Sequence, residues 1–337
     1  MDRHPVVTTP ADGRWTISRR LFVGGALGAV AAFNLLDARA ATPVATSPKP
    51  TRLAKTQVLK AGAAWLQARQ DAGGGFADMR GTIDLGVTAE IVTVLVALRN
   101  VGVAVKTDEA VGYLRKHAKA DVGQAAGGDG KVVVALVAGG ADPRKADGVD
   151  LVARVIASWH EATGTYGTTS LDNAFALMAL AVTGEKIPDL AIKTLATSQN
   201  GDGSWAFGAA SGGGSGDSNT TAFMIEALVA TGHRADKAVG KAVEYLRSTR
   251  SANGGFGLGS GAPSDANSTA FVITALTAAG EKLKSKEWSG APASLAALQN
   301  EGGAFRYTDA EPGDDLLATI GALLALSGAA EPVLPKV

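Results

Sequence analysis

The sequence contains no cysteine among its 337 residues. This absence excludes disulfides, thiolate nucleophiles, cysteine-ligated zinc and a lipid-anchored N-terminal cysteine. The chain has only four histidines, so we expect no metal site. The formal net charge is zero, and therefore nothing indicates nucleic acid as a partner. Aromatic residues make up 5% of the chain, whereas glycine is frequent, with 43 residues. Frequent glycine without a collagen period is typical of proteins with many turns, including repeat proteins.

The first 40 residues have the organisation of an export signal. Residues 18–23 read Ser-Arg-Arg-Leu-Phe-Val, an apolar run follows from Leu21 to Leu36, and small residues precede a cleavage site after Ala40. The apolar run is too short and too rich in Gly and Ala for a stable membrane span. The segment resembles a twin-arginine signal of bacteria. This resemblance implies a protein that folds in the cytoplasm and is exported to the periplasm, the cell wall or the medium. An ordinary secretory signal or an uncleaved anchor is the alternative.

The remaining chain divides by composition into a leader, one long domain and a short tail. Residues 41–54 are rich in Pro, Thr and Ala and are predicted to be a flexible leader. Residues 55–330 form the main domain, and residues 331–337 form the tail. The signal carries a charge of +2, so the cleaved chain carries about −2. We expect this chain to be a monomer with no membrane span.

The long domain contains six repeats. In each repeat a Leu is followed four residues later by a Gly at the end of an Ala-rich apolar run. The pairs are Leu98/Gly102, Leu136/Gly140, Leu180/Gly184, Leu228/Gly232, Leu276/Gly280 and Leu324/Gly328. Successive glycines lie 38, 44, 48, 48 and 48 residues apart. The equal spacing predicts that the last three repeats are in register residue for residue.

Each repeat combines two helical patterns around a Gly-aromatic turn. Residues 237–247 are amphipathic, whereas residues 221–230 are apolar nearly all round. A helix without a polar face must be covered on every side. Alternating half-exposed and buried helices therefore predict an all-α fold, an (α/α)6 toroid in which an outer ring of helices surrounds an inner ring. An open solenoid is the alternative, but six nearly equal repeats favour closure. Repeat two has residues 127–130, Gly-Gly-Asp-Gly, in place of the aromatic turn.

Two segments resemble a known repeat. Residues 199–205 read Gln-Asn-Gly-Asp-Gly-Ser-Trp and residues 298–305 read Leu-Gln-Asn-Glu-Gly-Gly-Ala-Phe. They resemble the repeats of the prenyltransferase/squalene-cyclase superfamily, and this resemblance implies an α/α toroid. The residues assigned to this structural motif are Gln67, Phe76, Gln199, Trp205, Phe256, Gln299 and Phe305. We expect each Gln to hydrogen-bond free backbone N–H groups at the start of the next helix, beneath the aromatic ring.

The residues that make members of this superfamily catalytic are missing. Terpenoid cyclases of this kind use an Asp-x-Asp-Asp motif, and the nearest run, residues 309–315, has a different spacing. Protein prenyltransferases hold zinc with Asp, Cys and His, and related thioester domains need a Cys, which this chain lacks. Residues 200–204 alternate oxygen ligands as a calcium loop does, but Ser211 stands where such a loop has Glu. These absences favour a binding protein over an enzyme.

One polar set stands at the start of the buried helices. We name it the polar rim, and it consists of Asp172, Asn173, Asp217, Asn219, Asp265, Asn267, Asp314 and Asp315. Asn219, Asn267 and Asp315 each lie thirteen residues before the closing Gly. Equal offsets in a closed ring place side chains at one height, so the rim is predicted to encircle one mouth of the toroid. Each residue alone is also explained as a helix N-cap.

The polar rim leads to two hypotheses about function. The first is an exported protein that binds a small polar ligand or a protein partner at the inner-helix N-terminal end. Similarity to the helical domain of cobalamin carriers makes a corrinoid one version of this ligand. The second hypothesis is an enzyme of the terpenoid-cyclase-like class, or a glycan-active enzyme that uses rim carboxylates as acid and base. A structural or surface-layer role is a further alternative.

Overall fold

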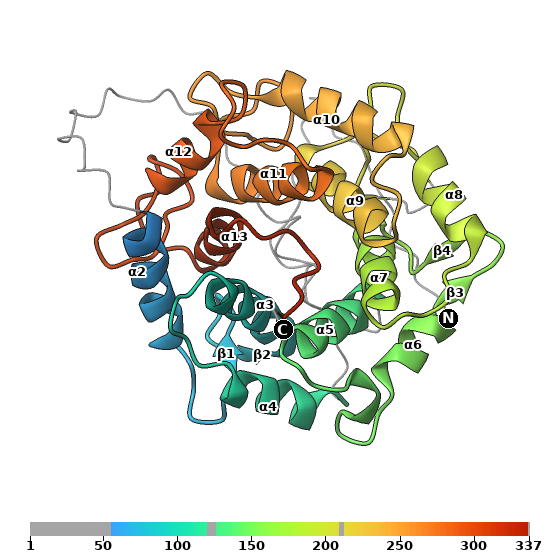
Figure 1. The fold of residues 1–337 in the computed structure, drawn as a ribbon, viewed down its shortest axis with the longest axis horizontal. Helices are drawn as coiled ribbons and strands as arrows, with labels where there is room; N and C mark the ends of the chain where they lie inside the picture. Colours follow the sequence, from blue (N-terminus) through green and yellow to red (C-terminus); the bar gives the residue numbers. More distant parts are fainter. Residues whose placement is uncertain (1–54, 120–125, 209–211, 336–337) are drawn as a thin grey trace, which may run out of the picture.

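The computed structural model describes residues 55–119, 126–208 and 212–335. The predicted export signal, the leader and Ser211 lie outside the described residues. Helices account for most of the described chain, and they form two concentric rings (Figure 1). The outer helices are α2 (Lys55–Gln67), α4 (Asp108–His117), α6 (Leu151–Ala157), α8 (Asp189–Thr197), α10 (Lys237–Thr249) and α12 (Gly290–Ala296). The inner helices are α3 (Leu85–Asn100), α5 (Ala126–Ala138), α7 (Ser170–Val182), α9 (Ser218–Ala230), α11 (Ala266–Ala279) and α13 (Leu316–Ser327).

The inner ring is closed. Each inner helix packs against the next along the chain, and α13 packs against α3 and against the outer helix α2 of the first repeat. The predicted (α/α)6 toroid with six helix pairs is therefore confirmed, and the open solenoid is wrong. An inner helix of 13 residues such as α9 is about 20 Å long at 1.5 Å per residue. The inner ring, measured along its axis, is therefore also about 20 Å deep.

The two rings differ in burial as their sequence patterns predict. In α9 every residue from Ser218 to Leu228 is buried, because the inner helices α7 and α11 and the outer helices α8 and α10 pack against it. In α10 the apolar positions Val239, Ala242, Val243 and Leu246 are buried, and the charged residues lie on the opposite side. Outer helices therefore separate the apolar inner ring from solvent.

The Leu/Gly signature ends each inner helix. All six closing glycines have a positive φ: Gly102, Gly140, Gly184, Gly232, Gly280 and Gly328. In repeat four the N–H of His233 donates to the Leu228 carbonyl at 2.7 Å, and in repeat five Glu281 donates to Leu276 at 2.9 Å. These bonds satisfy carbonyls that the helix end leaves free, and the left-handed residue that makes them possible is glycine.

Short extended segments carry the turns between outer and inner helices. β1 (Phe76–Ala77) pairs with β2 (Ile83–Asp84), and β3 (Trp159–His160) pairs with β4 (Thr165–Tyr166). Repeats four and six reduce this pairing to single bridges, Trp205 with Asp217 and Phe305 with Asp315. The bridges fix the aromatic residue of each turn beside the first residues of the inner helix. A 3₁₀ turn, η1 (Pro143–Lys145), completes the elements.

Repeat two differs from the sequence prediction. Residues 127–130 do not form its turn, because they lie in the first turns of α5. A Cβ atom on Gly130 would stand 2.6 Å from the Phe175 carbonyl oxygen, and one on Gly127 would stand 2.8 Å from Asp172 Oδ1. The glycines thus allow α5 to approach α7 closely. The segment that precedes α5, residues 120–125, is outside the described part of the chain.

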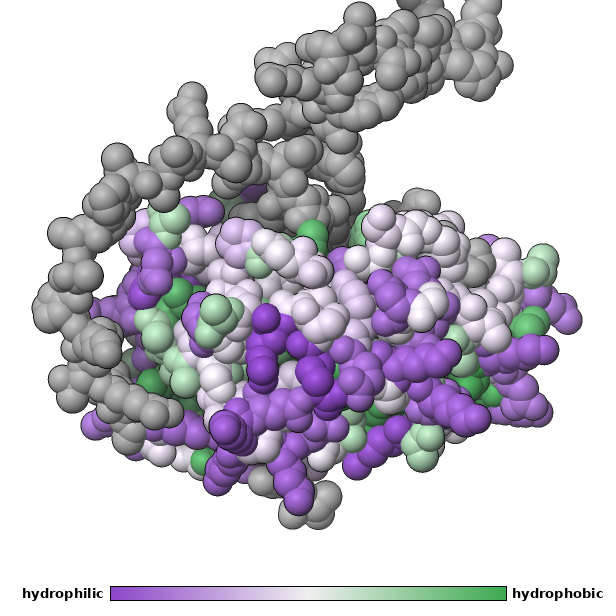
Figure 2. Space-filling model, turned by 90° about the horizontal axis from the view of Figure 1, so that it is seen from above, coloured by the Kyte–Doolittle hydropathy of each residue, from purple (hydrophilic) through white to green (hydrophobic). Residues whose placement is uncertain are grey.

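The outer surface shows no single large apolar face in the view of Figure 2, where small hydrophobic patches are separated by hydrophilic residues. The exposed large hydrophobic residues lie far apart in the sequence: Met79, Val101, Ile156, Leu190 and Leu334. No helix within the described ranges is long and apolar enough to cross a membrane.

Candidate functional site

Three carboxylates of the polar rim cap inner helices. Asp217 accepts a hydrogen bond from the Thr220 N–H at 2.7 Å, Asp265 accepts from Ser268 at 2.8 Å, and Asp315 accepts from Ala318 at 2.7 Å. Each is the N-cap residue of its helix. Each therefore satisfies a backbone donor that the helix start leaves free.

Two caps of the same ring were not predicted. Asp84 is the N-cap of α3, where it accepts from the Val87 N–H at 2.8 Å. Thr169 is the N-cap of α7. The sequence signal for both is their position at the end of an extended pair or turn immediately before an apolar helix.

A threonine four residues after the cap connects the turn to the helix. The N–H of Trp205 donates to Thr221 Oγ1 at 3.0 Å, and Thr221 donates in turn to the Asp217 carbonyl at 2.6 Å. The same bond from turn to threonine occurs in three further repeats, as Phe76 to Thr88, Phe256 to Thr269 and Phe305 to Thr319. In repeat three Asn173 takes the place of the threonine and accepts from the Tyr166 N–H at 3.0 Å. This rim asparagine is thus part of the turn.

The register predicted for the last repeat is wrong by two residues. Asp315 caps α13 and is therefore equivalent to Asp217 and Asp265, not to Asn219 and Asn267. The closing glycines keep their spacing, but α13 is shorter than α9 and α11. Leu317 consequently stands where repeats four and five have asparagine, and Leu171 stands there in repeat three.

Asp172 and Asp314 have local structural roles. Asp172 completes a capping box with Thr169, in which the carboxylate accepts from the Thr169 N–H at 3.1 Å. Asp314 accepts from Trp65 Nε1 at 3.0 Å and from Asn300 Nδ2 at 2.8 Å. Its bond to Trp65 joins the sixth repeat to the first. Asp314 therefore contributes to ring closure.

Burial changes the acidity of two rim carboxyls. The pKa of Asp265 is raised to about 6, because burial disfavours the charged form more than bonds from Ser268 and Tyr307 favour it. Burial also raises the pKa of Asp217, against bonds from Thr220. Burial also raises the pKa values of the two nearby phenols, Tyr245 and Tyr307. Burial and the nearby Asp217 and Asp202 raise the pKa of Tyr245 to about 12.

Asn219 and Asn267 are the rim residues whose side chains have no cap, turn or ring-closure role. They occupy the second helical position of α9 and α11, in adjacent repeats. In each, the side-chain Oδ1 is buried and has no hydrogen-bond partner in the described structure. Asn219 as a whole is 7% exposed. A buried amide oxygen without a donor is uncommon in folded proteins and costs about 1–3 kcal/mol.

Below these asparagines, phenylalanines of three neighbouring inner helices contact one another. Phe223 follows Asn219 by four residues on α9, and Phe271 follows Asn267 by four residues on α11, so each pair shares one helix face. The ring of Phe223 lies 5.3 Å from that of Phe175 on α7 and 4.9 Å from that of Phe271. Three neighbouring inner helices thus present one aromatic belt, defined as Phe175, Phe223 and Phe271.

A buried acid lies one turn further along the same stripe. Glu226 follows Phe223 by three residues and is 1% exposed. Its Oε1 accepts from the N–H of Glu331 at 3.3 Å, and its carboxyl also bonds to Thr274 on α11. Burial raises the pKa of Glu226 well above its usual value, and the nearby Glu331 raises it further. Glu226 is not among the site residues predicted from the sequence, although a single carboxylate within the apolar run 221–230 was a signal for it.

The glutamines of the repeat motif connect neighbouring repeats by donating hydrogen bonds to backbone carbonyls, not by accepting them from N–H groups. Gln199 Nε2 donates to the Gly203 carbonyl at 2.9 Å and to that of Ala238 in α10 at 2.8 Å. Gln299 donates in the same way to Gly303 and to Val58 in α2. The predicted location at the next helix start is correct. The predicted N–H partners are wrong, because the side-chain amide acts as donor.

The first repeat uses a different glutamine from the one predicted. Gln70, not Gln67, donates to the turn, at 2.9 Å from the Gly74 carbonyl. Gln70 precedes Phe76 by six residues, the spacing that also separates Gln199 from Trp205. The aromatic rings of the motif are core residues, as predicted: Phe76, Trp205, Phe256 and Phe305 are each at most 1% exposed.

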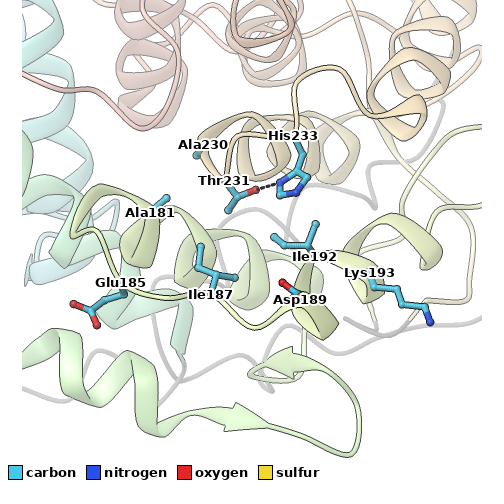
Figure 3. A pocket seen from close by; sticks show the side chains of 9 residues that line it. All are labelled: Ala181, Glu185, Ile187, Asp189, Ile192, Lys193, Ala230, Thr231 and His233. Carbon is cyan, nitrogen blue, oxygen red and sulfur yellow. Dashed lines mark hydrogen bonds between the residues drawn. The ribbon is translucent and has the colours of Figure 1, made fainter.

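A surface pocket of about 610 Å³ lies at the other end of the inner helices (Figure 3). Its lining includes Ala181 in the last turn of α7, Ala230 at the end of α9, and His233, whose Nδ1 is 3.3 Å from Thr231 Oγ1. None of the polar rim residues lines it. Among the described residues no group of three or more His, Asp or Glu is placed to hold a metal ion.

The sequence matches the prenyltransferase alpha-alpha toroid domain over residues 145–288 and 215–330, which together span more than half of the chain. The chain belongs to this family. No curated protein matches the sequence. Its fold is similar to that of solved toroid proteins, at identities that establish the architecture alone.

Three solved structures illustrate the similarity. The type II terpene cyclase MstE from Scytonema has a TM-score of 0.61 at 16% identity, with 81% of this chain and 97% of that chain covered. The GH76A alpha-1,6-mannanase from Salegentibacter has a TM-score of 0.60 at 12% identity, with 82% and 98% covered. A protein from Actinoplanes has a TM-score of 0.64 at 15% identity, with 82% and 99% covered. The toroid is thus shared by proteins that their names assign to terpene and to glycan chemistry.

Proposed function

We propose that this toroid binds a neutral ligand rich in hydroxyl or amide groups at the inner-helix N-terminal mouth of the ring. The observation that carries the proposal is the pair of buried, unpartnered Oδ1 atoms on Asn219 and Asn267. They occupy equivalent positions of adjacent repeats, one turn above Phe223 and Phe271. A ligand that donates hydrogen bonds to both oxygens would remove an unfavourable term from the free protein.

The neighbouring side chains define the chemistry of this ligand. The two amide oxygens require donors, and the aromatic belt offers flat apolar faces below them. Asp217 and Asp265 are occupied by their caps and by the Thr220 and Ser268 hydroxyls. A sugar ring satisfies both requirements, because it combines hydroxyl donors with an apolar face that packs on aromatic rings. We therefore place a glycan first among the ligands.

Binding is favoured over hydrolysis by the same contacts. Each oxygen of Asp217 accepts one hydrogen bond from Thr220, and each oxygen of Asp265 accepts one from Ser268. A general acid or base must exchange its proton with the substrate, and here that exchange would break the helix cap. We further propose that the binding takes place outside the cytoplasm, on the basis of the export signal predicted in residues 1–40.

Glu226 supports a second candidate, an acid-catalysed reaction of a terpenoid. Burial raises the pKa of this carboxyl well above its usual value, which favours its protonated form. A protonated acid in a dry site can protonate an alkene, and aromatic faces stabilise the cation that forms. Glu226 lies one helical turn from the aromatic belt. The printed names of the similar terpene cyclases agree in chemical class with this candidate.

Calorimetry on the full chain distinguishes the ligand classes. The probes are an alpha-1,6-linked mannooligosaccharide, geranylgeranyl dihydroxybenzoate and cyanocobalamin. We expect the glycan to bind, and we expect Asn219→Ala and Asn267→Ala each to weaken this binding at least tenfold. Asn253→Ala is the matched control, because Asn253 is an exposed asparagine in the turn of the same fifth repeat. It should bind as the unchanged protein does.

Two results would contradict the proposal. One is unchanged binding by the Asn219 and Asn267 variants. The other is a pair of negative results: none of the three probes gives a binding signal in calorimetry, and native mass spectra of the purified chain show no bound molecule. Conversion of the geranylgeranyl compound that is lost in Glu226→Gln would instead establish the second candidate.

A further inference from the structure

The chain segment after α13 enters the inner ring. Figure 1 shows it turning inward from α13 toward the centre. Val333 is buried at 4% exposure, and the Leu334 carbonyl accepts from Asn100 Nδ2 on α3 at 2.8 Å. The Glu331 N–H donates to Glu226 on α9. Residues 329–335 thus make contacts with both sides of the inner ring.

The contact with α9 brings two carboxyl groups together. Glu226 lies four residues before the end of α9, about 6 Å along the axis from that mouth. Thr274 on α11 bonds to its carboxyl. The charges that act on Glu331 are those of Glu226, Lys131 on α5 and Glu90 on α3.

The nearby cation is already engaged. Lys131 forms an ion pair with Glu90, and its Nζ lies 5.0 Å from the centre of the Phe175 ring. The carboxyl groups of Glu226, Glu331 and Glu90 therefore share one ammonium group at this site, that of Lys131. Two ionised carboxylates at Glu226 and Glu331 would repel each other there, because the buried site screens charge poorly. A proton retained by the pair removes this repulsion.

We propose that residues 329–335 are a plug that closes the inner-helix C-terminal mouth of the axis, and that the proton of the Glu331 carboxyl, near Glu226, keeps the plug in place. When Glu331 loses this proton to solvent, an additional carboxylate stands beside Glu226 and Glu90 and the segment moves out. The mouth then opens toward the aromatic belt. The plug stands independently of the proposed function, and only its role in controlling access to the axial site rests on that function.

The direction of the pH dependence follows from the two states of Glu331. Burial raises the pKa of Glu331 to about 7 in the docked segment, whereas a released segment returns it to the usual 4.5. The docked state therefore binds more protons between these two pH values. Docking is strongest below pH 4.5 and weakens as pH rises, by up to tenfold per pH unit. Across the whole window the change is on the order of 100-fold.

The absence of cysteine makes the plug directly measurable. Val333→Cys introduces a single thiol into the full chain, and its rate of modification by a maleimide reports release of the segment. Met79→Cys, at a residue that is 56% exposed, corrects for the effect of pH on thiol reactivity. We expect the corrected rate to rise on the order of 100-fold between pH 5 and pH 8. In Val333→Cys with Glu331→Gln it should stay low at both pH values.

Either of two outcomes of the maleimide experiment would contradict the proposed plug. A corrected rate that does not depend on pH, or one that rises equally in the Glu331→Gln background, means that the pair does not hold the segment. Leu246→Cys, at a fully buried residue of the outer helix α10, tests for global unfolding, and a parallel rise there would also contradict the proposal. The measurement needs no ligand. Failure of glycan binding with a pH-dependent rate would sink the proposed function and leave the plug intact.

Discussion

Replacing Asp265 with asparagine separates the capping role of this residue from the cost of burying its charge. Asp265 is 5% exposed and accepts from the Ser268 N–H and hydroxyl at 2.8 Å each. Asparagine keeps a side-chain oxygen for the N–H and caps helices about as well as aspartate does. It cannot ionise. The change therefore removes a titration while it preserves the cap.

The expected effect on stability follows from the pKa. Burial raises the pKa of Asp265 from 3.8 to about 6 in the folded protein. A raised value means that the stability contributed by the protonated group is complete below about pH 3.8 and is lost as pH rises through 6. A difference of about two pH units corresponds to about 3 kcal/mol. Relative to the unchanged protein, Asp265→Asn should therefore gain about 3 kcal/mol in unfolding free energy between pH 4 and pH 8.

Guanidinium unfolding at a series of pH values measures this difference. Asp142→Asn is the control, because Asp142 also caps a turn, as the N-cap of η1, but at the surface. The Arg144 N–H lowers the pKa of Asp142, so stability from this carboxylate is present at high pH and lost as pH falls. Its replacement should lose relative stability as pH rises, the opposite sign. Parallel pH curves for Asp265→Asn and the unchanged protein would show that burial does not shift the titration of Asp265.

Four further substitutions, one of them a control, test other contacts by chemical unfolding. Asn219→Leu should stabilise the protein by about 1–2 kcal/mol, because it removes a buried acceptor without a donor, and it should abolish glycan binding; destabilisation would show that the oxygen has a partner. Gly130→Ala should cost about 1–3 kcal/mol, because the added Cβ would stand 2.6 Å from an α7 carbonyl oxygen. Gly112→Ala on the exposed face of α4, with no atom within 4 Å, should instead stabilise by about 1 kcal/mol. Thr221→Val should cost about 1–3 kcal/mol by leaving the Trp205 N–H without its acceptor, and an unchanged midpoint would contradict that role.

The sequence predicts most of the fold because the repeats encode it locally. A buried helix without a polar face and a closing glycine recur six times, an aromatic turn recurs in five of the repeats, and each has one structural meaning. Closure follows from the similarity of all repeats. The exceptions are local: α13 starts two residues nearer its closing glycine than α9 and α11 do, and residues 127–130 continue a helix. Both depend on how neighbouring helices pack, which spacing alone does not show.

The candidate site is only partly predictable for a different reason. An aspartate before an apolar helix has the same sequence pattern whether it caps the helix or faces a ligand. Asp217 proves to be a cap, whereas Asn219, two residues later, leaves a buried oxygen unpartnered. Glu226 was visible as a lone carboxylate in an apolar run, but its partner Glu331 lies 105 residues away in sequence. Only the closed ring shows that the two meet.

The closure between the sixth and first repeats bears on how the chain can be rearranged. The Asp314–Trp65 bond spans 249 residues and the Gln299–Val58 bond spans 241, while the amine of Lys55 lies near Gly328. The junction between the last and first repeats thus uses the same glutamine bond as the junction between repeats four and five. A circular permutant that joins residue 328 to residue 55 and opens the surface loop at Gly232–Asp236 should therefore fold into the same ring. In a closed array of this kind, the place where the polypeptide starts is separable from the architecture it builds.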